Sequence, residues 1–511
     1  MSIGMLCGND RVCLRSAAHA ELTAPASYRV GTSPDPYIPN AAPASEVAED
    51  LDGDGKLDLV VTHRSDDSIY FLKGNGDGSF KTAVRIPVGS PIQGNLYVGD
   101  FNGDGKSDLF LPGAKGQAIV LPGNGDGTFK AAVVSSSFNL DGYYPRGWAV
   151  GKFTGGGKLN IAFTLPTNAG KAARYGVVPG NGDGTFGKAI LGPGDLIYSR
   201  WIVPGDFNRD GKTDLAVADG HGSSSDPGTA RMAILLGNGD GTFQRGENYP
   251  SPQFPSGDGW QDANAVGHPE NIVVADLTGR GILDVIVSDY SSTINVFMGN
   301  GDGTFRRAVS YNPGNYPRNV MPVDIDRDGK IDLVVNNVGI GIGGAIFQKV
   351  GAQSGSICIL SGNGDGTFRQ PIVYNPSAFP GYTLAADFNG DGHPDLATTQ
   401  VFDGNVIHVM LNKPNGKNLP PTFVNPPSAE MQGMTAHLSA LGEDDDGAEA
   451  LVYAWSTIGP VPARVDFGLN GTNAAQNTKG TFTKSGQYVL QCKITDKQGI
   501  SVIKLVVVKV P

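Results

Sequence analysis

Short apolar segments alternate with turns rich in glycine and aspartate along most of the chain. In one stretch the segments 95–99, 108–111, 117–121 and 129–134 are alternating or wholly apolar, and Gly or Asp turns separate them. Runs of this length, rich in β-branched and aromatic residues, are typical of β-strands. The pattern predicts a unit of four short antiparallel strands.

Two phrases show that this unit recurs. Gly-Asn-Gly-Asp-Gly-Thr/Ser-Phe occurs at 74–80, 123–129, 180–186, 237–243, 299–305 and 362–368. Asp-x-Asp/Asn-x-Asp-Gly-x-x-Asp alternates with it, beginning at Asp50, Asp100, Asp206, Asp324 and Asp387, with degenerate copies at Lys152 and Asp276. One such sheet cannot bury both faces alone, so the units must pack around an axis. We therefore predict an all-β fold, a seven-bladed β-propeller.

The two ends of the repeat indicate how the ring closes. After a strand at 406–411 the seventh unit reaches a degraded turn at 412–416 and leaves the pattern without an outer strand. The segment 26–30 resembles the outer strands of other units, such as 83–86. We expect this N-terminal strand to complete the last blade, since closure removes sticky sheet edges.

A second domain follows Pro420-Pro421. Residues 421–511 contain six or seven short strand patterns, which predict an Ig-like β-sandwich. The expected organisation is a disordered or processed segment at 1–25, the propeller at 26–413, a linker at 414–420 and the sandwich at 421–511.

The repeats resemble the FG-GAP or VCBS family, which includes the integrin α-subunit head, and also calcium-containing lectin propellers. The segments 453–456, 485–488 and 496–499 of the second domain resemble PKD or cadherin-like modules. The resemblance implies calcium binding and a role in adhesion or carbohydrate recognition outside the cell. The C-terminal module would serve as a spacer or a carbohydrate contact.

The Asp-rich phrase has the ligand spacing of an EF-hand loop, with side chains at positions 1, 3, 5 and 9 and a backbone carbonyl at position 7. Oxygen ligands alone favour Ca²⁺ over zinc or copper. Without a bidentate Glu at position 12, we expect affinities of about 10⁻⁴–10⁻³ M. The predicted ligands of about five Ca²⁺ ions are Asp50, Asp52, Asp54, Lys56 and Asp58; Asp100, Asn102, Asp104, Lys106 and Asp108; Asp206, Asn208, Asp210, Lys212 and Asp214; Asp324, Asp326, Asp328, Lys330 and Asp332; and Asp387, Asn389, Asp391, His393 and Asp395.

The two degenerate copies are expected to bind no ion. Lys152, Thr154, Gly156 and Asn160 replace all four side-chain ligands of one copy. In the other, Arg280 stands between Asp276 and Asp284, where its guanidinium could neutralise both carboxylates.

Net charge and composition support the metal hypothesis. The formal charge is −11, and the acidic residues gather in the Asp-rich loops. Five Ca²⁺ ions would bring the charge to −1. The acidic excess argues against nucleic acid as a partner.

No stretch of 18 apolar residues predicts a transmembrane segment. The four cysteines do not form a disulfide framework, and Cys358 and Cys492 are expected as buried free thiols.

Recognition is expected on the rim opposite the Asp-rich loops, where the connections vary in length and include 244–270 and 336–356. Aromatic and arginine side chains near a propeller axis could stack on sugars or bind a carboxylate, although packing around the channel mouth explains them equally well. The candidate ligand contacts are Trp260, Tyr144, Arg146, Arg200, Tyr316 and Arg318.

These features favour an extracellular or cell-surface binding protein, which we expect to be monomeric. The expected partner is a polysaccharide, a glycoprotein or a surface protein. A signal peptide is not evident; Ala18-His19-Ala20 has the form of a cleavage site, but no apolar run precedes it. The alternatives are a polysaccharide lyase or dehydratase, for which His268 near Trp260 and Glu270 is the one local cluster, and a purely structural repeat protein. The sequence leaves the question of catalysis open and assigns no catalytic residue.

Overall fold

The computed structural model describes residues 20–31, 43–63, 66–135, 145–165, 173–197, 199–219, 231–250, 269–289, 293–314, 316–338, 355–374, 380–400, 405–414, 420–445, 447–458, 461–497 and 499–511. Over these residues the protein is all-β, and its helical elements are three short 3₁₀ turns, η1 (Ala114–Gly116), η2 (Ala448–Ala450) and η3 (Asn473–Gln476).

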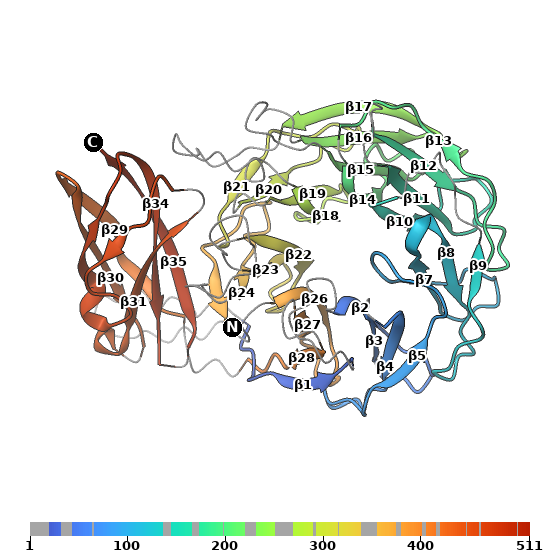
Figure 1. Ribbon diagram of the computed structural model, residues 1–511, viewed down its shortest axis with the longest axis horizontal. Helices are drawn as coiled ribbons and strands as arrows, with labels where there is room; N and C mark the ends of the chain where they lie inside the picture. Colours follow the sequence, from blue (N-terminus) through green and yellow to red (C-terminus); the bar gives the residue numbers. More distant parts are fainter. Residues whose placement is uncertain are drawn as a thin grey trace, which may run out of the picture.

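Antiparallel sheets of four strands stand around a ring, as a β-propeller requires (Figure 1). The sheets that stand alone are β2-β3-β4-β5, β6-β7-β8-β9, β10-β11-β12-β13, β14-β15-β16-β17, β18-β19-β20-β21 and β1-β28-β27-β26. The set β22-β23-β24-β25 belongs to a larger sheet that continues into the C-terminal domain.

Each sheet runs from an innermost strand near the ring axis to an outer strand. The innermost strands are β2 (Pro43–Glu49), β6 (Tyr97–Gly99), β10 (Trp148–Gly151), β14 (Ser199–Gly205), β18 (Pro269–Ala275), β22 (Pro317–Val323) and β26 (Pro380–Ala386). The second strands are β3 (Asp58–His63), β7 (Asp108–Pro112), β11 (Asn160–Leu165), β15 (Asp214–Asp219), β19 (Asp284–Asp289), β23 (Asp332–Asn337) and β27 (Asp395–Gln400).

The third strands are β4 (Ser68–Leu72), β8 (Ala118–Leu121), β12 (Arg174–Val178), β16 (Arg231–Gly237), β20 (Thr293–Phe297), β24 (Ser356–Leu360) and β28 (Val406–Met410). The outer strands are β5 (Val84–Pro87), β9 (Val133–Ser135), β13 (Ile190–Leu191), β17 (Phe243–Pro250), β21 (Val309–Tyr311), β25 (Ile372–Tyr374) and β1 (Ala26–Arg29). Residues 244–250, expected in a long connection, are therefore part of strand β17.

The core lies between neighbouring sheets. Every residue of the second strands β3, β15 and β27 is buried, because each of these strands is covered on both faces. The phenylalanine that ends each glycine-rich turn packs across the boundary between sheets: Phe80 meets Phe388 with ring centroids 5.4 Å apart, and Phe207 meets Phe305 at 5.6 Å. These contacts give the phenylalanines a packing role between neighbouring sheets.

The N-terminal strand closes the ring as predicted. β1 pairs with β28, with Ala26 opposite Val409 and Arg29 opposite Val406. The Tyr28 hydroxyl accepts a hydrogen bond of 3.2 Å from the Phe80 amide of the first sheet. Part of the segment 1–25, which was expected to be disordered or processed, packs against the ring. Leu22 pairs with Asn412, and Ala20 is 2% exposed. Residues 1–19 lie outside the described part of the chain.

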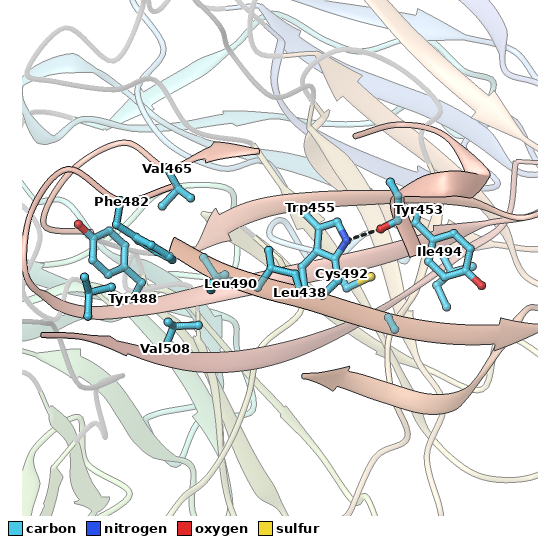
Figure 2. Close-up of a cluster of buried hydrophobic side chains, with 14 of the residues drawn as sticks. Leu438, Tyr453, Trp455, Val465, Phe482, Tyr488, Leu490, Cys492, Ile494 and Val508 are labelled. Carbon is cyan, nitrogen blue, oxygen red and sulfur yellow. Dashed lines mark hydrogen bonds between the residues drawn. The ribbon is translucent and has the colours of Figure 1, made fainter. Parts of the chain in front are cut away.

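The C-terminal domain has two sheets that share one core. One sheet contains β29 (Thr422–Gln432), β30 (Thr435–Glu443), β33 (Asn477–Thr481) and β32 (Asp466–Phe467); the other contains β31 (Val452–Ile458), β34 (Gly486–Thr495) and β35 (Ser501–Val510). Figure 2 shows Trp455 between Leu438 and Cys492, with its indole N–H donating to the Ala475 carbonyl at 2.8 Å. Trp455 is therefore a core residue.

This domain is joined to the ring by a shared sheet. β35 pairs with the outer strand β25, with Val502 opposite Ile372 and Ser501 opposite Val373 (Figure 1). The sequence predicted two domains separated by a linker at 414–420, most of which lies outside the described residues, and gave no sign of this pairing.

The remaining sequence expectations concern cysteines and membrane segments. Cys358 and Cys492 are buried free thiols, as predicted, and burial raises the pKa of each to about 12. None of the helices in the described part of the chain is long and apolar enough to cross a membrane.

Candidate metal loops and recognition residues

The Asp-rich loops share one backbone form, and we number them 1 to 7 in chain order. Loop 1 spans 50–58, loop 2 spans 100–108, loop 3 spans 152–160, loop 4 spans 206–214, loop 5 spans 276–284, loop 6 spans 324–332 and loop 7 spans 387–395. Each connects the innermost strand of a sheet to its second strand. The glycine at position 6 takes a left-handed backbone, as Gly55 does with φ 81°, which explains why glycine stands there.

Backbone amides fix the carboxylates of loop positions 1, 3 and 5. In loop 1, Asp50 accepts from the amides of Gly53 at 2.8 Å and Gly55 at 2.9 Å. The Asp54 amide donates to Asp52 at 3.2 Å, and the Lys56 amide donates to Asp54 at 3.1 Å. In loops 2, 4, 6 and 7 the amide of position 5 likewise donates to the side chain of position 3, and the amide of position 7 donates to the side chain of position 5. These bonds give the side chains of the loops the same arrangement.

Two loops bring three carboxylates close enough to share one cation. One carboxylate oxygen from each of Asp50, Asp52 and Asp54 lies within 4.8 Å of the others. Asp324, Asp326 and Asp332 form the second group with the same limit. Carboxylate oxygens have lone pairs for more than one partner, so those that accept backbone bonds can still bind Ca²⁺.

The aspartate at position 9 also has a structural role that the sequence analysis missed. Asp58 is fully buried and accepts from the Leu51 amide at 3.2 Å and the Gly74 amide at 2.9 Å. It thereby joins its own loop to the glycine-rich turn of the same sheet. Asp284 does the same in loop 5, where no ion is expected. The sequence keeps an aspartate at position 9 of loop 5 although other ligands of that loop are lost. This retained aspartate indicates a role besides metal binding.

Crowding of buried carboxylates is strongest in loop 6. Burial raises the pKa of Asp332 to about 7, and the nearby charges of Asp326 and Asp328 act in the same direction. Burial and the Asp328 charge raise the pKa of Asp326 to about 6. Because a divalent cation stabilises ionised carboxylates, these groups fit a cation site, and binding should release protons below about pH 7.

Lysine and arginine side chains partly neutralise other loops. Lys73 Nζ contacts Asp52 and lies 3.0 Å from Asp54 Oδ2, and this bond is the main cause that lowers the pKa of Asp54. In loop 5 the Arg280 guanidinium lies 3.7 Å from Asp284, which confirms the predicted ion pair for one of the two carboxylates. In loop 3 Asn160 accepts from the Thr154 amide at 2.9 Å, so this loop keeps its form without carboxylates.

We predict that Asp284→Ala destabilises the protein by about 2–4 kcal/mol, because the buried amides of Leu277 and Gly299 lose their acceptor. Asp284→Asn should cost less, since one amide oxygen can still accept, as that of Asn160 does in loop 3. Urea unfolding with and without Ca²⁺ measures both. A loss for Asp284→Ala that appears only with Ca²⁺ would instead indicate an ion in loop 5.

The glycine-rich turns lie on the same rim as the loops, as predicted. The Gly127 amide donates to the Leu51 carbonyl of loop 1 at 3.0 Å, and the Gly184 amide donates to the Phe101 carbonyl of loop 2 at 3.0 Å. Gly303 and Phe207 repeat the bond at loop 4. Each of these loops therefore contacts the neighbouring sheet through its backbone. A change in the conformation of a loop would affect the packing between sheets.

Of the predicted recognition residues, Arg318 is the one that lies beside an aromatic cluster among the described residues. The Arg318 guanidinium carbon lies 5.4 Å from the centre of the Tyr382 ring, and Tyr382 lies 6.3 Å from Trp201. All three side chains are half-buried near the first residues of their innermost strands, on the rim opposite the loops. Arg318 was predicted, whereas Tyr382 was missed. Tyr382 occupies the same repeat position as Trp201, five residues before its loop, and aligning the repeats would have found it.

Two of the other predicted recognition residues have described side chains, and the remaining ones lie wholly or partly outside the described residues. Arg146 is exposed, and Tyr316 is half-buried with a positive φ of 57°. Arg200 lies in β14, although its side chain is outside the described residues. Tyr144, Trp260 and His268 also lie outside them, as does most of the connection 336–356.

A family model supports the repeat on independent grounds. The model for the FG-GAP-like repeat matches residues 50–111, 206–287, 276–335 and 349–398. The chain carries FG-GAP-like repeats. The matches include every loop except loop 3, the copy that has lost its carboxylates. Together with the ring of four-stranded sheets, these matches support a β-propeller that contains FG-GAP-like repeats.

Solved structures resemble the chain at low identity. BBS1N in complex with ARL6DN, in crystals soaked with lead, is 11% identical over 77% of this chain and 97% of that chain, with a TM-score of 0.46. The Dos1 propeller is 10% identical over 69% of this chain and 74% of that chain, with a TM-score of 0.40. No curated protein matches the sequence.

Proposed function

We propose that this protein is a calcium-loaded, seven-bladed propeller that recognises carbohydrate or a surface protein outside the cell. The observation that carries the proposal is the repeated loop geometry. Backbone amides hold the carboxylates of loops 1, 2, 4, 6 and 7 in place, and in loops 1 and 6 three carboxylate oxygens lie within 4.8 Å of one another. Ca²⁺ would supply charge balance and rigidity there, with no role in a covalent reaction.

The proposed count of seven blades is supported by the repeat and by the paired strands. Each of loops 1 to 7 joins the first two strands of one set of four strands. The fourth strand of the last set is β1, which pairs with β28. The two C-terminal sheets, of four and three strands, support an Ig-like sandwich of the PKD or cadherin kind. Its pairing with β25 favours a fixed extension of the ring over a flexible spacer.

Calorimetric titration of the full chain with Ca²⁺ tests the metal proposal. We expect about five ions, bound at about 10⁻⁴–10⁻³ M. Asp104→Ala in loop 2 should remove one ion, whereas the matched change Arg280→Ala in loop 5 should remove none. Heat signals for fewer than two ions in the wild-type protein would contradict the proposal.

The cluster of Trp201, Arg318 and Tyr382 is the best-supported recognition surface. A guanidinium beside aromatic rings can bind a carboxylate while a ring covers the sugar face. The expected ligand is therefore an acidic polysaccharide. The cluster also lies on the rim away from the proposed ions, so metal and ligand would not compete for space.

Retention of the protein on immobilised glycans, with Ca²⁺ and with EDTA, tests this surface. We expect acidic polysaccharides to retain the wild-type protein in Ca²⁺, and Arg318→Ala to weaken retention at least tenfold. Arg146→Ala is the matched control, because Arg146 occupies the same repeat position but is exposed. Equal retention of Arg318→Ala and wild type would exclude the cluster. Retention of a protein partner instead of any glycan would favour the adhesion alternative.

A further inference from the structure

Loop 6 lies where three distant parts of the chain meet. Ile325, between the proposed ligands Asp324 and Asp326, is 1% exposed. Its side chain belongs to a buried cluster with Ala20, Tyr374 and Ile500. These residues come from the N-terminal segment, from the outer strand β25 and from the turn that precedes β35. One loop residue therefore shares a buried cluster with the beginning of the described chain and with the C-terminal domain.

The backbone of Ile325 is held by two further groups. Its amide donates to Asp332 Oδ2 at 3.1 Å, and its carbonyl accepts from Asn412 Nδ2 at 2.7 Å. In loops 1, 2, 4 and 7 the equivalent carbonyl accepts from a glycine in the turn of the neighbouring sheet. The neighbour of loop 6 has the degraded turn at 412–416, so the buried Asn412 side chain supplies the donor there.

The N-terminal segment packs beside this degraded turn. The Thr23 amide donates to the Leu411 carbonyl at 2.8 Å, and the Lys413 amide donates to the Glu21 carbonyl at 2.9 Å. The Glu21 amide donates to Asn412 Oδ1 at 3.0 Å. Asn412 thus joins the backbone of loop 6 directly to the N-terminal segment.

Tyr374 extends the same contact to the C-terminal domain. Its hydroxyl donates to the Ala20 carbonyl, and it directly follows Ile372 and Val373, the residues that pair with β35. Figure 1 shows β35 on the outer side of the ring, beside the sheet that contains β24. Loop 6, the N-terminal segment and the C-terminal domain therefore share one set of buried contacts around Ile325 and Tyr374.

Charge makes the order of this loop depend on a cation. Loop 6 holds four aspartates, of which Asp326 is 6% exposed and Asp332 is 1% exposed. Ionised carboxylates this close repel one another, and burial strengthens the repulsion. Movement of Asp324 and Asp326 apart would displace Ile325, since it lies between them in the sequence.

We propose that the ion held by loop 6 is a clamp between domains. When it binds, it fixes Ile325 and so holds the N-terminal segment and the C-terminal domain against the ring. The proposal rests on the calcium binding proposed above, and it assigns to loop 6 a role that loops 1, 2, 4 and 7 do not share.

Asp328→Ala in loop 6 and Asp210→Ala in loop 4 form a matched pair for the test. Both aspartates occupy position 5, and each lies near the lysine of position 7, with Lys330 Nζ 2.7 Å from Asp328 and Lys212 Nζ 3.3 Å from Asp210. The full chain of each variant is examined by calorimetric Ca²⁺ titration and by hydrogen exchange with mass spectrometry. We expect each variant to bind one ion fewer than the wild type.

The two variants should differ in where protection is lost. Asp328→Ala should exchange at least tenfold faster over 20–23, 372–374 and 500–503, whereas Asp210→Ala should change exchange only around its own sheet and the neighbouring turn. If both lose an ion but 500–503 stays protected in Asp328→Ala, the clamp is wrong and calcium binding stands. If the wild type binds no Ca²⁺, the proposed function fails and the clamp fails with it.

A milder change covers the case in which Asp328→Ala does not fold. Asp328→Asn keeps an oxygen at the same place while it removes one charge, and Asp210→Asn is its partner. At Ca²⁺ concentrations that half-fill the sites, faster exchange over 500–503 in Asp328→Asn alone supports the clamp. Equal exchange over 500–503 in both variants overturns it.

Discussion

We expect removal of Ca²⁺ with EDTA to lower the thermal unfolding midpoint of the ring by about 10 °C. At about 10 mM Ca²⁺ and a Kd of about 10⁻⁴ M, each site stabilises the folded state by about 2.7 kcal/mol, so five sites contribute on the order of 10 kcal/mol. Scanning calorimetry at stepped Ca²⁺ concentrations measures the effect. The free energy of unfolding should rise with the logarithm of the Ca²⁺ concentration, in proportion to the number of ions.

Mg²⁺ is the control for this prediction. It demands a tighter octahedral geometry than the loops provide and gives up its water reluctantly, so the same concentration of Mg²⁺ should restore little of the lost stability. An unfolding midpoint that is the same in EDTA and in Ca²⁺ would contradict the proposal that the loops bind Ca²⁺. A midpoint restored equally by Mg²⁺ would point to simple charge screening.

Features that recur in register along the chain could be predicted from the sequence. The strand pattern, the closing strand Ala26–Arg29 and the packing of Phe80 and its equivalents depend on local periodicity and on positions that recur in register. The ion pair between Arg280 and Asp284 was also predictable, because both residues lie in one short loop. The ions themselves and the ligand remain predictions.

Contacts between distant repeats could not be predicted in this way. Tyr382 reaches Trp201 across 181 positions of sequence, and no local pattern encodes that approach. The pairing of β35 with β25 involves two residues on each strand, too few to leave a mark in the sequence. Lys73 follows strand β4 and approaches Asp52 and Asp54 from outside their loop. The spacing of ligands within the loop therefore does not reveal this competing cation.

Glu46→Leu should stabilise the protein, and more so at high pH. Glu46 is 8% exposed on β2, and neither of its carboxyl oxygens has a hydrogen-bond partner among the described residues. The other sheets have Leu96, Trp148, Ile202, Ile272, Val320 and Thr383 at this repeat position, four residues before the loop. Burial raises the pKa of Glu46 from 4.5 to about 8. An uncharged apolar side chain therefore suits the site better.

The sign of the pH dependence follows from where the proton is held. Between about pH 4.5 and pH 8 the folded state keeps the proton of Glu46 while the unfolded state releases it, so the stability of the wild type falls as pH rises through this range. The loss by pH 8 is on the order of 4 kcal/mol, from a pKa difference of more than three units at about 1.4 kcal/mol each. Glu46→Leu removes that loss.

Urea unfolding of the wild type and Glu46→Leu at pH 5 and pH 8, with Ca²⁺ saturating at both, measures this difference while the loops stay loaded. Glu49→Leu is the matched control, because Glu49 lies on the same strand but is only half-buried and lies 3.5 Å from the Ser107 hydroxyl. It should give no comparable gain at pH 8. An equal effect of Glu46→Leu at both pH values would mean that Glu46 stays ionised in the folded protein, which requires a cation or donor beside it. A buried carboxylate at the boundary between β2 and β26, where the ring closes, would then bind a ligand of its own.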